Sequence, residues 1–312
     1  MSQMLHVPVL LKEILQFVEN SSSKICWGLD GTFGRGGHAR ALLDKFPDLK
    51  IWALDKDSQA INFAKENFHN ELQQNRLVLT QSDFSLVSPE LAKTQFVPEK
   101  FDYILLDLGV SSPQLDEADR GFSFYQDGPL DMRMDQRQEL SAFEIVNHFS
   151  EGEINDIFKN FGDVRSPFRV TRAIVNDRKN KPFETTQQLS GLIERVEGWR
   201  RKGHHPATKY FLALRIAVNN ELDGVKKVIE PMIKMLNPGG LFLVITFHSS
   251  EDRIVKWAFK ENQSMGRILT KKVIQTTDEE IKQNVRARSA KLRVFERSDF
   301  EGKATRRTSS DN

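Results

Sequence analysis

The stretch Leu29-Asp30-Gly31-Thr32-Phe33-Gly34-Arg35-Gly36-Gly37-His38 decides the fold of this chain. An apolar run over 24–29 precedes the acid, four glycines fall within positions 31–37, and a helix-like run covers 39–46. A strand, a glycine-rich turn and a helix in this order form the local unit of nucleotide-type cofactor sites. The spacing is not the dinucleotide fingerprint G-x-G-x-x-G, because position 33 is Phe. The acid at the strand end favours S-adenosylmethionine, whose amino-acid part carries an ammonium group, over a turn without a ligand.

Two later apolar runs also end in acidic residues. Residues 51–55 end on Asp55, about 20 residues beyond the glycines, where nucleotide-binding folds place an acid for the ribose hydroxyls. Residues 103–108 contain Asp107 and have the apolar character of a strand covered on both faces. Because these strands alternate with helical stretches, the sequence predicts an α/β fold with a doubly wound, mostly parallel sheet. Ligands of such sheets lie beyond the carboxyl ends of the strands, so Asp30, Asp55 and Asp107 are expected at one edge.

Composition indicates a globular protein of one large or two medium domains. The 312 residues are 39% hydrophobic and 28% charged, and a net charge of +2 requires any nucleic-acid surface to be a local patch. The single cysteine, Cys26, falls in the first predicted strand and is expected to be a buried, inert thiol. No run approaches the roughly 18 apolar residues of a membrane span, and no signal-peptide pattern is present. We therefore expect a cytoplasmic protein without a membrane partner.

The loop Leu108-Gly109-Val110-Ser111-Ser112-Pro113-Gln114 carries the predicted chemistry. It resembles the loop of enzymes that methylate exocyclic amino groups. An aromatic amine is a poor nucleophile because its lone pair is delocalised, so fixed acceptors around its N–H groups must align that lone pair with the methyl group. Candidate acceptors are Asp107, Ser111 or Ser112, and a loop carbonyl. Cys26 lies far upstream, which argues against attack on carbon 5 of a pyrimidine.

Two positions, Phe84 and His248, leave alternatives open. Phe84, after the predicted strand 76–80, either stacks on adenine or belongs to the core, and the sequence alone favours the core. Asp57 offers N-cap chemistry to a predicted helix that ends at residue 67. His248, after the predicted strand 241–247, either acts on the substrate base or makes a structural hydrogen bond. No His, Cys and carboxylate set has structural-zinc spacing, and methyl transfer needs no metal.

Several long motifs resemble those of the bacterial ribosomal RNA small-subunit methyltransferase H family, also called MraW. They cover residues 30–38, 105–115, 127–135, 247–253 and 286–293, together with Arg120-Gly121-Phe122-Ser123-Phe124 and His205-Pro206-Ala207-Thr208. The resemblance implies S-adenosylmethionine-dependent methylation of the exocyclic amine of one cytosine in the 16S rRNA decoding region. It also implies direct transfer without a covalent intermediate.

The resemblance can be carried over position by position. It favours an adenine contact for Phe84 and makes His38 a neighbour of the ligand. With the glycine turn included, the predicted cofactor-binding residues are Asp30, Gly34, Gly36, Gly37, His38, Asp55, Phe84, Asp107 and Gln114. The predicted catalytic residues are Asp107, Ser111, Ser112, Pro113 and His248.

The family resemblance further implies a class I methyltransferase core with an inserted helical domain. We place the insert at 116–205, between core segments 1–115 and 206–312. Ser141 and Ser150 have capping-box spacing at the start of two predicted helices, and further helices are expected over 168–179 and 186–196. Pro167 lies where the sequence departs from the family pattern and is expected to end or delay a helix.

Basic residues gather in this insert and just beyond its end, from Arg165 through Arg178 to Lys181 and again over 195–209. A solvated helical face would show the same residues, but beside a methyltransferase site a phosphate-binding surface is favoured. The predicted RNA-binding residues are Arg172, Arg200, Arg201, Lys202 and Lys209. The expected partner is 16S rRNA within the small ribosomal subunit, and monomer and homodimer both remain open.

Two other functions compete with methylation. A catalytically inert RNA-binding assembly factor could retain the cofactor fold, although the intact Asp107 and Ser111-Ser112-Pro113 loop argue against it. A nucleotide-dependent dehydrogenase is disfavoured by the glycine spacing.

Overall fold

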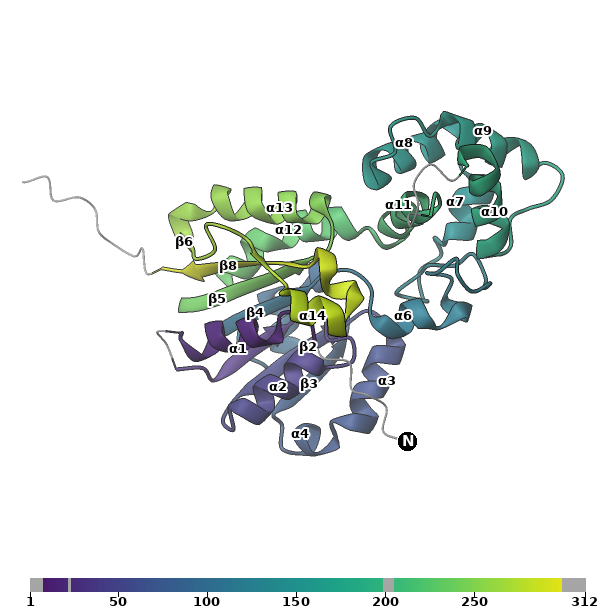
Figure 1. Cartoon of the computed structure of the whole chain (residues 1–312). Coiled ribbons are helices and arrows are strands. Elements are labelled where there is room, and N and C mark those ends of the chain that lie inside the picture. Colours follow the sequence, from purple (N-terminus) through teal and green to yellow (C-terminus); the bar gives the residue numbers. More distant parts are fainter. Residues whose placement is uncertain (1–7, 22–23, 199–204, 299–312) are drawn as a thin grey trace, which may run out of the picture. The chain divides into compact units, whose positions relative to one another are not determined.

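The computed structural model describes residues 8–21, 24–198 and 205–298, which divide into two compact units (Figure 1). The sheet unit contains residues up to Asp55, Gln59–Leu108 and the residues from Gly224 onward. The helical unit contains Lys56–Ser58 and Gly109–Asp223. The predicted insert, 116–205, therefore lies within the helical unit.

The sheet unit is built on one sheet, in which eight strands lie within the described residues. The strands are β1 (Trp27–Asp30), β2 (Lys50–Asp55), β3 (Leu77–Gln81), β4 (Phe101–Asp107), β5 (Leu236–Thr246), β6 (Gly266–Ile268), β7 (Ile274–Gln275) and β8 (Lys291–Arg297). Strands β3, β2, β1, β4 and β5 are parallel neighbours in that order. β8 pairs antiparallel with β5, β6 and β7. The predicted doubly wound, mostly parallel sheet is thus confirmed.

Helices cover both faces of this sheet (Figure 1). Along β2, Ile51 and Ala53 join the core that contains residues of α1 (Leu11–Glu19) and α2 (Gly37–Lys45). Trp52 and Leu54 join the opposite core, with residues of α12 (Glu221–Lys234) and α13 (Ser249–Glu261). Because each fully buried apolar side chain contributes roughly 1.5–3 kcal/mol, these two cores stabilise the sheet from both sides. The other helices are α3 (Ser58–Asn67), α4 (His69–Gln73), α5 (Pro89–Thr94) and α14 (Asp278–Gln283).

One close contact restricts the residue types where β1 and β4 pair. Gly28 lies opposite Tyr103, whose side chain is fully buried. A Cβ atom at position 28 would lie 2.0 Å from Cζ of Tyr103, far inside van der Waals contact. Only glycine leaves room for the ring, which explains a glycine inside a buried strand.

The helical unit has a core of its own. Its helices are α6 (Ser112–Asp116), α7 (Ala142–His148), α8 (Glu151–Gly162), α9 (Phe168–Asp177), α10 (Thr186–Glu197) and α11 (Thr208–Asn219). Phe158, Ile174 and Leu214 are fully buried in this core, which is separate from both cores of the sheet unit. Pro129 and Thr185 form an isolated antiparallel bridge.

Helix starts in this unit follow the predicted signals. The Ser141 side chain accepts a hydrogen bond from the Glu144 N–H at the start of α7. Ser150 makes a complete capping box at the start of α8. α9 begins directly after Pro167, five residues beyond the end of α8 at Gly162. The interruption predicted from this proline is therefore present.

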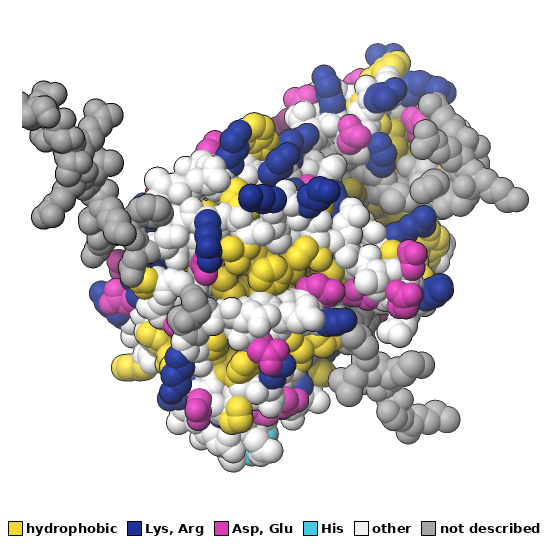
Figure 2. Space-filling model, turned by 60° about the vertical axis from the view of Figure 1, so that its left-hand side comes forward, with side chains coloured by type: hydrophobic (Ala, Val, Ile, Leu, Met, Phe, Trp, Pro, Cys, Tyr) yellow, Lys and Arg dark blue, Asp and Glu magenta, His cyan; other side chains and the backbone are white. Residues whose placement is uncertain are grey.

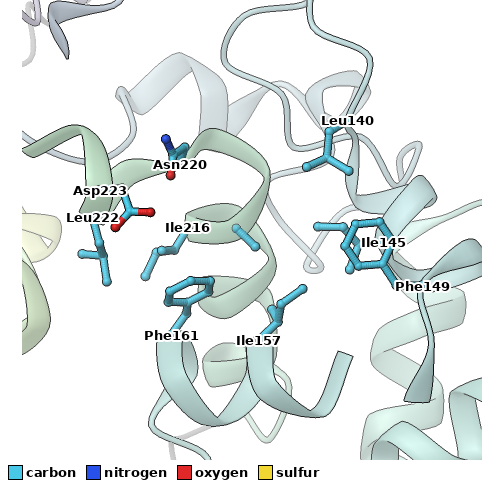
Figure 3. A pocket seen from close by; sticks show the side chains of 10 residues that line it. Leu140, Ile145, Phe149, Ile157, Phe161, Ile216, Asn220, Leu222 and Asp223 are labelled. Atoms are coloured by element: carbon cyan, nitrogen blue, oxygen red, sulfur yellow. The ribbon is translucent and has the colours of Figure 1, made fainter. Parts of the chain in front are cut away.

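An apolar cavity of about 200 Å³ lies in the helical unit (Figure 3). Ile145, Ile157 and Phe161 are among the apolar side chains that line it, and Asp223 is the one ionisable residue in its wall. None of the predicted catalytic or cofactor-binding residues lines this cavity. Its chemistry suits an apolar occupant rather than a charged cofactor.

Two predictions about the sheet unit are wrong in detail. Cys26 is half-buried and lies just before β1, because the pairing of β1 with β2 begins at Trp27 and that with β4 begins at Gly28. Its N–H and that of Trp27 both donate to the Asp102 carboxylate (2.7 and 2.9 Å). β5 begins at Leu236 rather than at residue 241, because Phe101 already pairs with Leu236. Within the described residues, no helix combines the length and apolar character needed to span a bilayer.

Candidate cofactor and catalytic site

Three acids lie at the carboxyl ends of adjacent parallel strands. Asp30 ends β1, Asp55 ends β2 and Asp107 ends β4, and the sheet order β2-β1-β4 places the three strands side by side. This is the edge at which doubly wound sheets bind their ligands. The structure therefore brings together the acids that the sequence pattern pointed to.

The glycine turn is tied to the ends of the same strands. Gly31 N–H donates to Leu105 O of β4 (3.0 Å), and Gly34 N–H donates to Oδ2 of Asp55 (2.8 Å). Gly36 has a φ of 67°, and a Cβ atom there would lie 2.4 Å from the Phe33 ring. The left-handed backbone and the close ring both require glycine at position 36. Gly37 follows as the first residue of α2.

Burial raises the pKa values of two of the three acids, Asp30 and Asp107, to near or above neutral pH. Asp30 is 3% exposed, and burial raises its pKa from 3.8 to about 7, with a smaller lowering by the Thr32 N–H and a raising by Asp55. Burial, then the charges of Asp30 and Glu251, raise the pKa of Asp107 to about 8. The Asp107 side chain keeps 27% of its surface exposed, so water reaches part of it. Such shifts are typical of residues that bind cations or exchange protons.

Asp107 also has an unused acceptor. Its backbone N–H donates to Oγ1 of Thr32 (2.6 Å), which holds the end of β4 against the glycine turn. Its carboxylate Oδ1 is buried and has no hydrogen-bond partner. Because a buried acceptor without a donor is costly, this atom is suited to a donor from a ligand.

His38 lies beside Asp107 in its neutral form. Its Nε2 is 2.9 Å from Val9 O, so Nε2 carries the proton that is donated to this carbonyl. Nδ1 then presents a lone pair, 3.8 Å from Oδ2 of Asp107. Burial lowers the pKa of His38 to about 4, against a smaller raising by the Val9 bond. The buried position of His38, at 7% exposed, agrees with a role in the turn rather than on the surface of α2.

The position of Phe84 is compatible with both alternatives, a core residue and an adenine contact. It begins the short 3₁₀ helix Phe84–Leu86 and is half-buried against the core that contains Trp52 and Leu54. A Cβ atom on Gly31 would lie 3.1 Å from Cβ of Phe84, so the residue also borders the glycine turn. It belongs in part to the core, and a stacking role stays a prediction.

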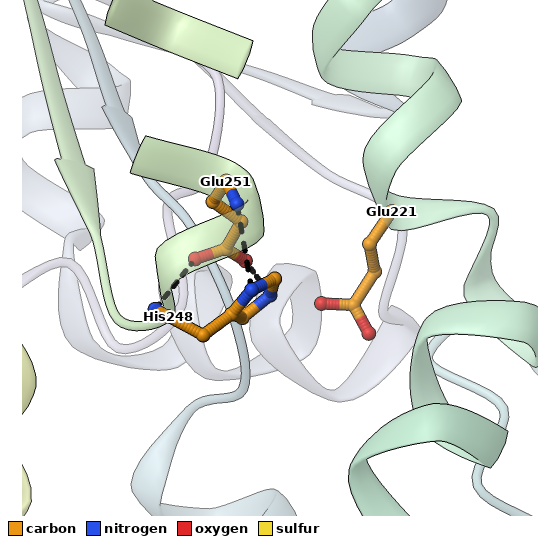
Figure 4. Close-up of side chains that lie close together, drawn as sticks. All are labelled: Glu221, His248 and Glu251. Carbon is orange, nitrogen blue, oxygen red and sulfur yellow. Dashed lines mark hydrogen bonds and ion pairs between the residues drawn. The ribbon is translucent and has the colours of Figure 1, made fainter. Parts of the chain in front are cut away.

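His248 is held by its own helix (Figure 4). It is the N-cap of α13, where Nδ1 accepts from the Glu251 N–H (3.4 Å), and Nε2 lies 2.9 Å from Oε1 of Glu251. Oε2 of Glu251 accepts from the N–H groups of Phe247 and His248 (2.9 and 3.3 Å). The structural hydrogen bond is thus present, and a catalytic role of His248 stays a prediction. Glu251 was missed, although its capping-box spacing from His248 was visible in the sequence.

The loop after Asp107 continues into the helical unit. Ser111 caps α6, which contains Ser112 and Pro113 in its first turn. The Gln114 side chain completes the capping box through Ser111 N–H (2.9 Å) and donates to Oδ2 of Asp57 (2.7 Å). Asp57 therefore bonds to distant side chains, a role that its position at a helix start did not indicate.

The MraW methylase family profile matches residues 3–298 of this chain. The chain belongs to this family. Ribosomal RNA small subunit methyltransferase H of Bdellovibrio bacteriovorus is 54% identical over 294 residues, which cover 94% of this chain and 88% of the relative. The protein of the same name from Halothermothrix orenii is 40% identical over 317 residues, covering 94% of this chain and 98% of the relative. An rRNA methylase structure from Streptococcus thermophilus covers 95% of this chain and 99% of its own at 11% identity and a TM-score of 0.42, too low to carry an inference.

Family membership and strand order together identify the fold. The sheet unit is the Rossmann-like α/β core of a methyltransferase, with β8 as the antiparallel partner of β5. The helical unit is the part of this methylase that departs from a plain doubly wound sheet.

The predicted RNA-binding residues of this methylase are spread over the helical unit. Arg172 on α9 is 66% exposed and lies 3.7 Å from Glu151, and Lys209 on α11 donates to Asp163 O (2.9 Å). Arg200, Arg201 and Lys202 lie outside the described residues. Figure 2 shows Lys and Arg side chains in groups on the face drawn, in keeping with local patches on a chain of net charge +2.

One member of the first basic cluster has a structural role instead. Arg178 donates to Val146 O and Phe149 O (2.7 Å each) at the end of α7. These bonds satisfy carbonyls that the helix end leaves open. We therefore exclude Arg178 from the candidate phosphate-binding surface.

Proposed function

We propose that this methylase transfers the methyl group of S-adenosylmethionine to the exocyclic amine of a cytosine in the decoding region of 16S rRNA. The observation that carries the proposal is the buried Oδ1 of Asp107, an acceptor without a donor at the ligand-binding edge of the sheet. Family membership and the names of the relatives support the rRNA substrate. We place the reaction in the cytoplasm, on the small ribosomal subunit.

The residues at this edge fit S-adenosylmethionine. The cofactor would be held by Asp55 at its ribose hydroxyls and by Asp30 at its ammonium group, with Gly34, Gly36 and Gly37 leaving room for close backbone approach. Phe84 borders the turn and would contact the adenine. Bound S-adenosylmethionine supplies an electrophilic methyl group on a positively charged sulfur. Acids, rather than bases, are the complementary side chains for that charge.

Asp107 is the residue for which we propose the central catalytic role. Its free oxygen would accept one N–H of the cytosine amine, which localises the nitrogen lone pair and aligns it for attack. In its ionised form Asp107 would take the proton that the methylated nitrogen releases, and a pKa of about 8 makes this carboxylate a stronger base than an exposed aspartate. We assign Ser111, Ser112 and Pro113 to the shaping of the same loop, and His248 to orientation of the base.

Direct transfer is favoured by the place of Cys26. A covalent route through a pyrimidine ring needs a thiolate at the ligand-binding edge. Cys26 precedes β1 and therefore lies at the opposite end of that strand from Asp30. This arrangement agrees with methylation of an amine rather than of a ring carbon.

We propose that the helical unit, and within it the insert 116–205, selects the RNA. Arg172, Lys209 and the undescribed Arg200, Arg201 and Lys202 would neutralise phosphates. Phe168 adds a half-exposed aromatic ring at the start of α9, with the Arg172 guanidinium 6.0 Å from its centroid. Aromatic rings flanked by arginines suit unpaired RNA bases, which are the form in which a base amine is accessible.

Methyl transfer from labelled S-adenosylmethionine tests the proposal. Naked 16S rRNA and small subunits from cells lacking the gene serve as parallel substrates, and mass spectrometry of the nucleosides identifies the modified base. We expect N4-methylated cytidine with the wild type and a loss of at least about 100-fold in rate with Asp107→Asn. An enzyme that binds RNA and S-adenosylmethionine but labels neither substrate would instead be an assembly factor.

A further inference from the structure

Three residues after β2 belong to the other unit of the molecule. Asp55 ends β2 in the sheet unit, and the next three residues, Lys56–Ser58, are part of the helical unit. The chain then returns to the sheet unit at Gln59. Asp57 is thus two peptide bonds from the carboxylate that we assign to the ribose.

Asp57 is the centre of a buried polar network. Its Oδ2 accepts from Nε2 of Gln114 (2.7 Å) and from Nη1 of Arg120 (2.8 Å). Asp57, Gln114 and Arg120 are 3%, 6% and 1% exposed. Nη2 of Arg120 also donates to the carbonyls of Arg133 and Met134 (3.0 and 3.3 Å). Such a network is sensitive to the loss of any one partner, because water cannot replace it.

The orientation of Gln114 is dictated by its neighbours. Oε1 of Gln114 accepts from the Ser111 N–H, so Nε2 must face Asp57. The same side chain therefore sets the start of α6, where Ser111, Ser112 and Pro113 lie, and bonds to Asp57. Both ends of the Gln114 amide are engaged within the helical unit. The direct cofactor contact that the family resemblance implied for Gln114 stays a prediction.

We infer that Asp57 is a positioning residue that couples the ribose-binding carboxylate of Asp55 to the catalytic loop through Gln114 and Arg120. A displacement of Asp57 moves the segment that carries Asp55 and, through Gln114, the segment that carries Ser111–Pro113. Cofactor affinity and turnover are then controlled by one buried carboxylate that touches neither reactant. The part of the inference that concerns turnover rests on the proposed function. The part that concerns cofactor affinity requires only that the protein binds S-adenosylmethionine.

Relocating the charge within the network provides the test. Asp57→Asn removes the negative charge that faces Arg120, and Gln114→Glu adds a second one beside Asp57. The double variant, Asp57→Asn with Gln114→Glu, returns one carboxylate to the network, since a carboxylate at position 114 can accept from Ser111 N–H and from the amide at position 57. Each protein is assayed by calorimetric titration with S-adenosylmethionine, by single-turnover methyl transfer and by thermal unfolding.

We expect each single variant to bind S-adenosylmethionine about tenfold more weakly and to transfer the methyl group about tenfold more slowly. The double variant should recover to within about threefold of the wild type in both, a strongly non-additive result. Asn147→Ala is the matched control, because it removes hydrogen bonds elsewhere in the same unit, from Asn147 to Phe143 O and Phe183 O and from Phe183 N–H to Asn147 (2.8–3.0 Å). It should lower the melting temperature and leave cofactor affinity unchanged.

Three results would overturn the inference. A folded Asp57→Asn with wild-type affinity and rate would reduce Asp57 to a purely structural residue. A Gln114→Glu defect that Asp57→Asn fails to relieve would favour direct contact between Gln114 and the cofactor. An Asn147→Ala variant with the same loss of cofactor affinity would mean that any damage to the helical unit has this effect. If the wild type transfers no methyl group, the proposed function fails, and the cofactor titrations still decide the coupling.

Discussion

Replacing Asp30 with asparagine is expected to stabilise the ligand-free protein more at pH 8 than at pH 5. Burial raises the pKa of Asp30 from 3.8 to about 7. Between these two values the folded state holds a proton that the unfolded state has lost. The free energy of unfolding therefore falls as the pH rises from about 4 to about 7, and the full penalty is present above pH 7.

The size of this effect follows from the pKa shift. About 3 units at 1.36 kcal/mol each correspond to roughly 4 kcal/mol, of which about a third is already present at pH 5. The stability difference between Asp30→Asn and wild type should thus grow by about 2–3 kcal/mol between pH 5 and pH 8. Asparagine can keep the bond from Thr32 N–H to Oδ1 (3.1 Å). The charge of Asp30 also raises the pKa of Asp107, so removing this charge lowers the pKa of Asp107. This second effect also favours the stability of Asp30→Asn at the higher pH.

Denaturant unfolding of both proteins at pH 5 and pH 8 measures this difference. Asp102→Asn is the matched control, since Asp102 is also buried but accepts from Cys26 N–H, Trp27 N–H and Asn237 Nδ2 at 2.7–2.9 Å. An amide cannot accept from all three, so this variant should lose about 1–3 kcal/mol at pH 8. If the difference in free energy of unfolding between Asp30→Asn and wild type is the same at both pH values, the buried charge of Asp30 does not destabilise the protein.

Further predictions concern ligands. Asp55→Ala should weaken S-adenosylmethionine binding by more than about 1.4 kcal/mol, since it leaves the ribose donors unpaired, and unchanged affinity by calorimetry would remove Asp55 from the site. Affinity for this cation should rise between about pH 6 and pH 9, as Asp30 and Asp107 lose the protons that their raised pKa values of about 7 and 8 retain; a flat profile contradicts the assignment. Arg172→Ala should lower RNA affinity and reduce the salt slope by about 1, whereas Phe168→Ala should lower affinity at an unchanged slope. If both variants had the same salt slope of RNA affinity, Arg172 would be a solvated residue of α9 that contacts no phosphate.

The acid edge could be predicted from the sequence because its signals are local. Asp30, Asp55 and Asp107 each follow a short apolar run, and parallel strands deliver their ends to one edge whatever lies between them. The helices at Ser141 and Ser150 were equally accessible, because a cap and its partner are three residues apart. Predicting where these two helices begin required no knowledge of the rest of the fold.

The parts that escaped prediction depend on partners far along the chain. Asp57 bonds to Gln114 and Arg120, 57 and 63 residues later, and no periodicity connects such positions. Its place before a helix suggested a cap, which is the local use of the same carboxylate. The Asp102 carboxylate that accepts from the Cys26 N–H likewise follows 76 residues later. Side-chain bonds over such distances are visible only once the fold has brought them together.

The helical unit is discontinuous in sequence, because it combines the three residues Lys56–Ser58 with Gly109–Asp223. A block comprising Gly109–Asp223 would carry Arg120 into a new host without the Asp57 carboxylate, and breaking such a buried pair costs about 3–5 kcal/mol. Recombination that exchanged this block between methyltransferases would therefore be penalised unless the turn after β2 moved with it. The helical unit, which we propose selects the RNA, and the three-residue turn after β2 therefore form one structural unit that is encoded in two separate stretches of the gene.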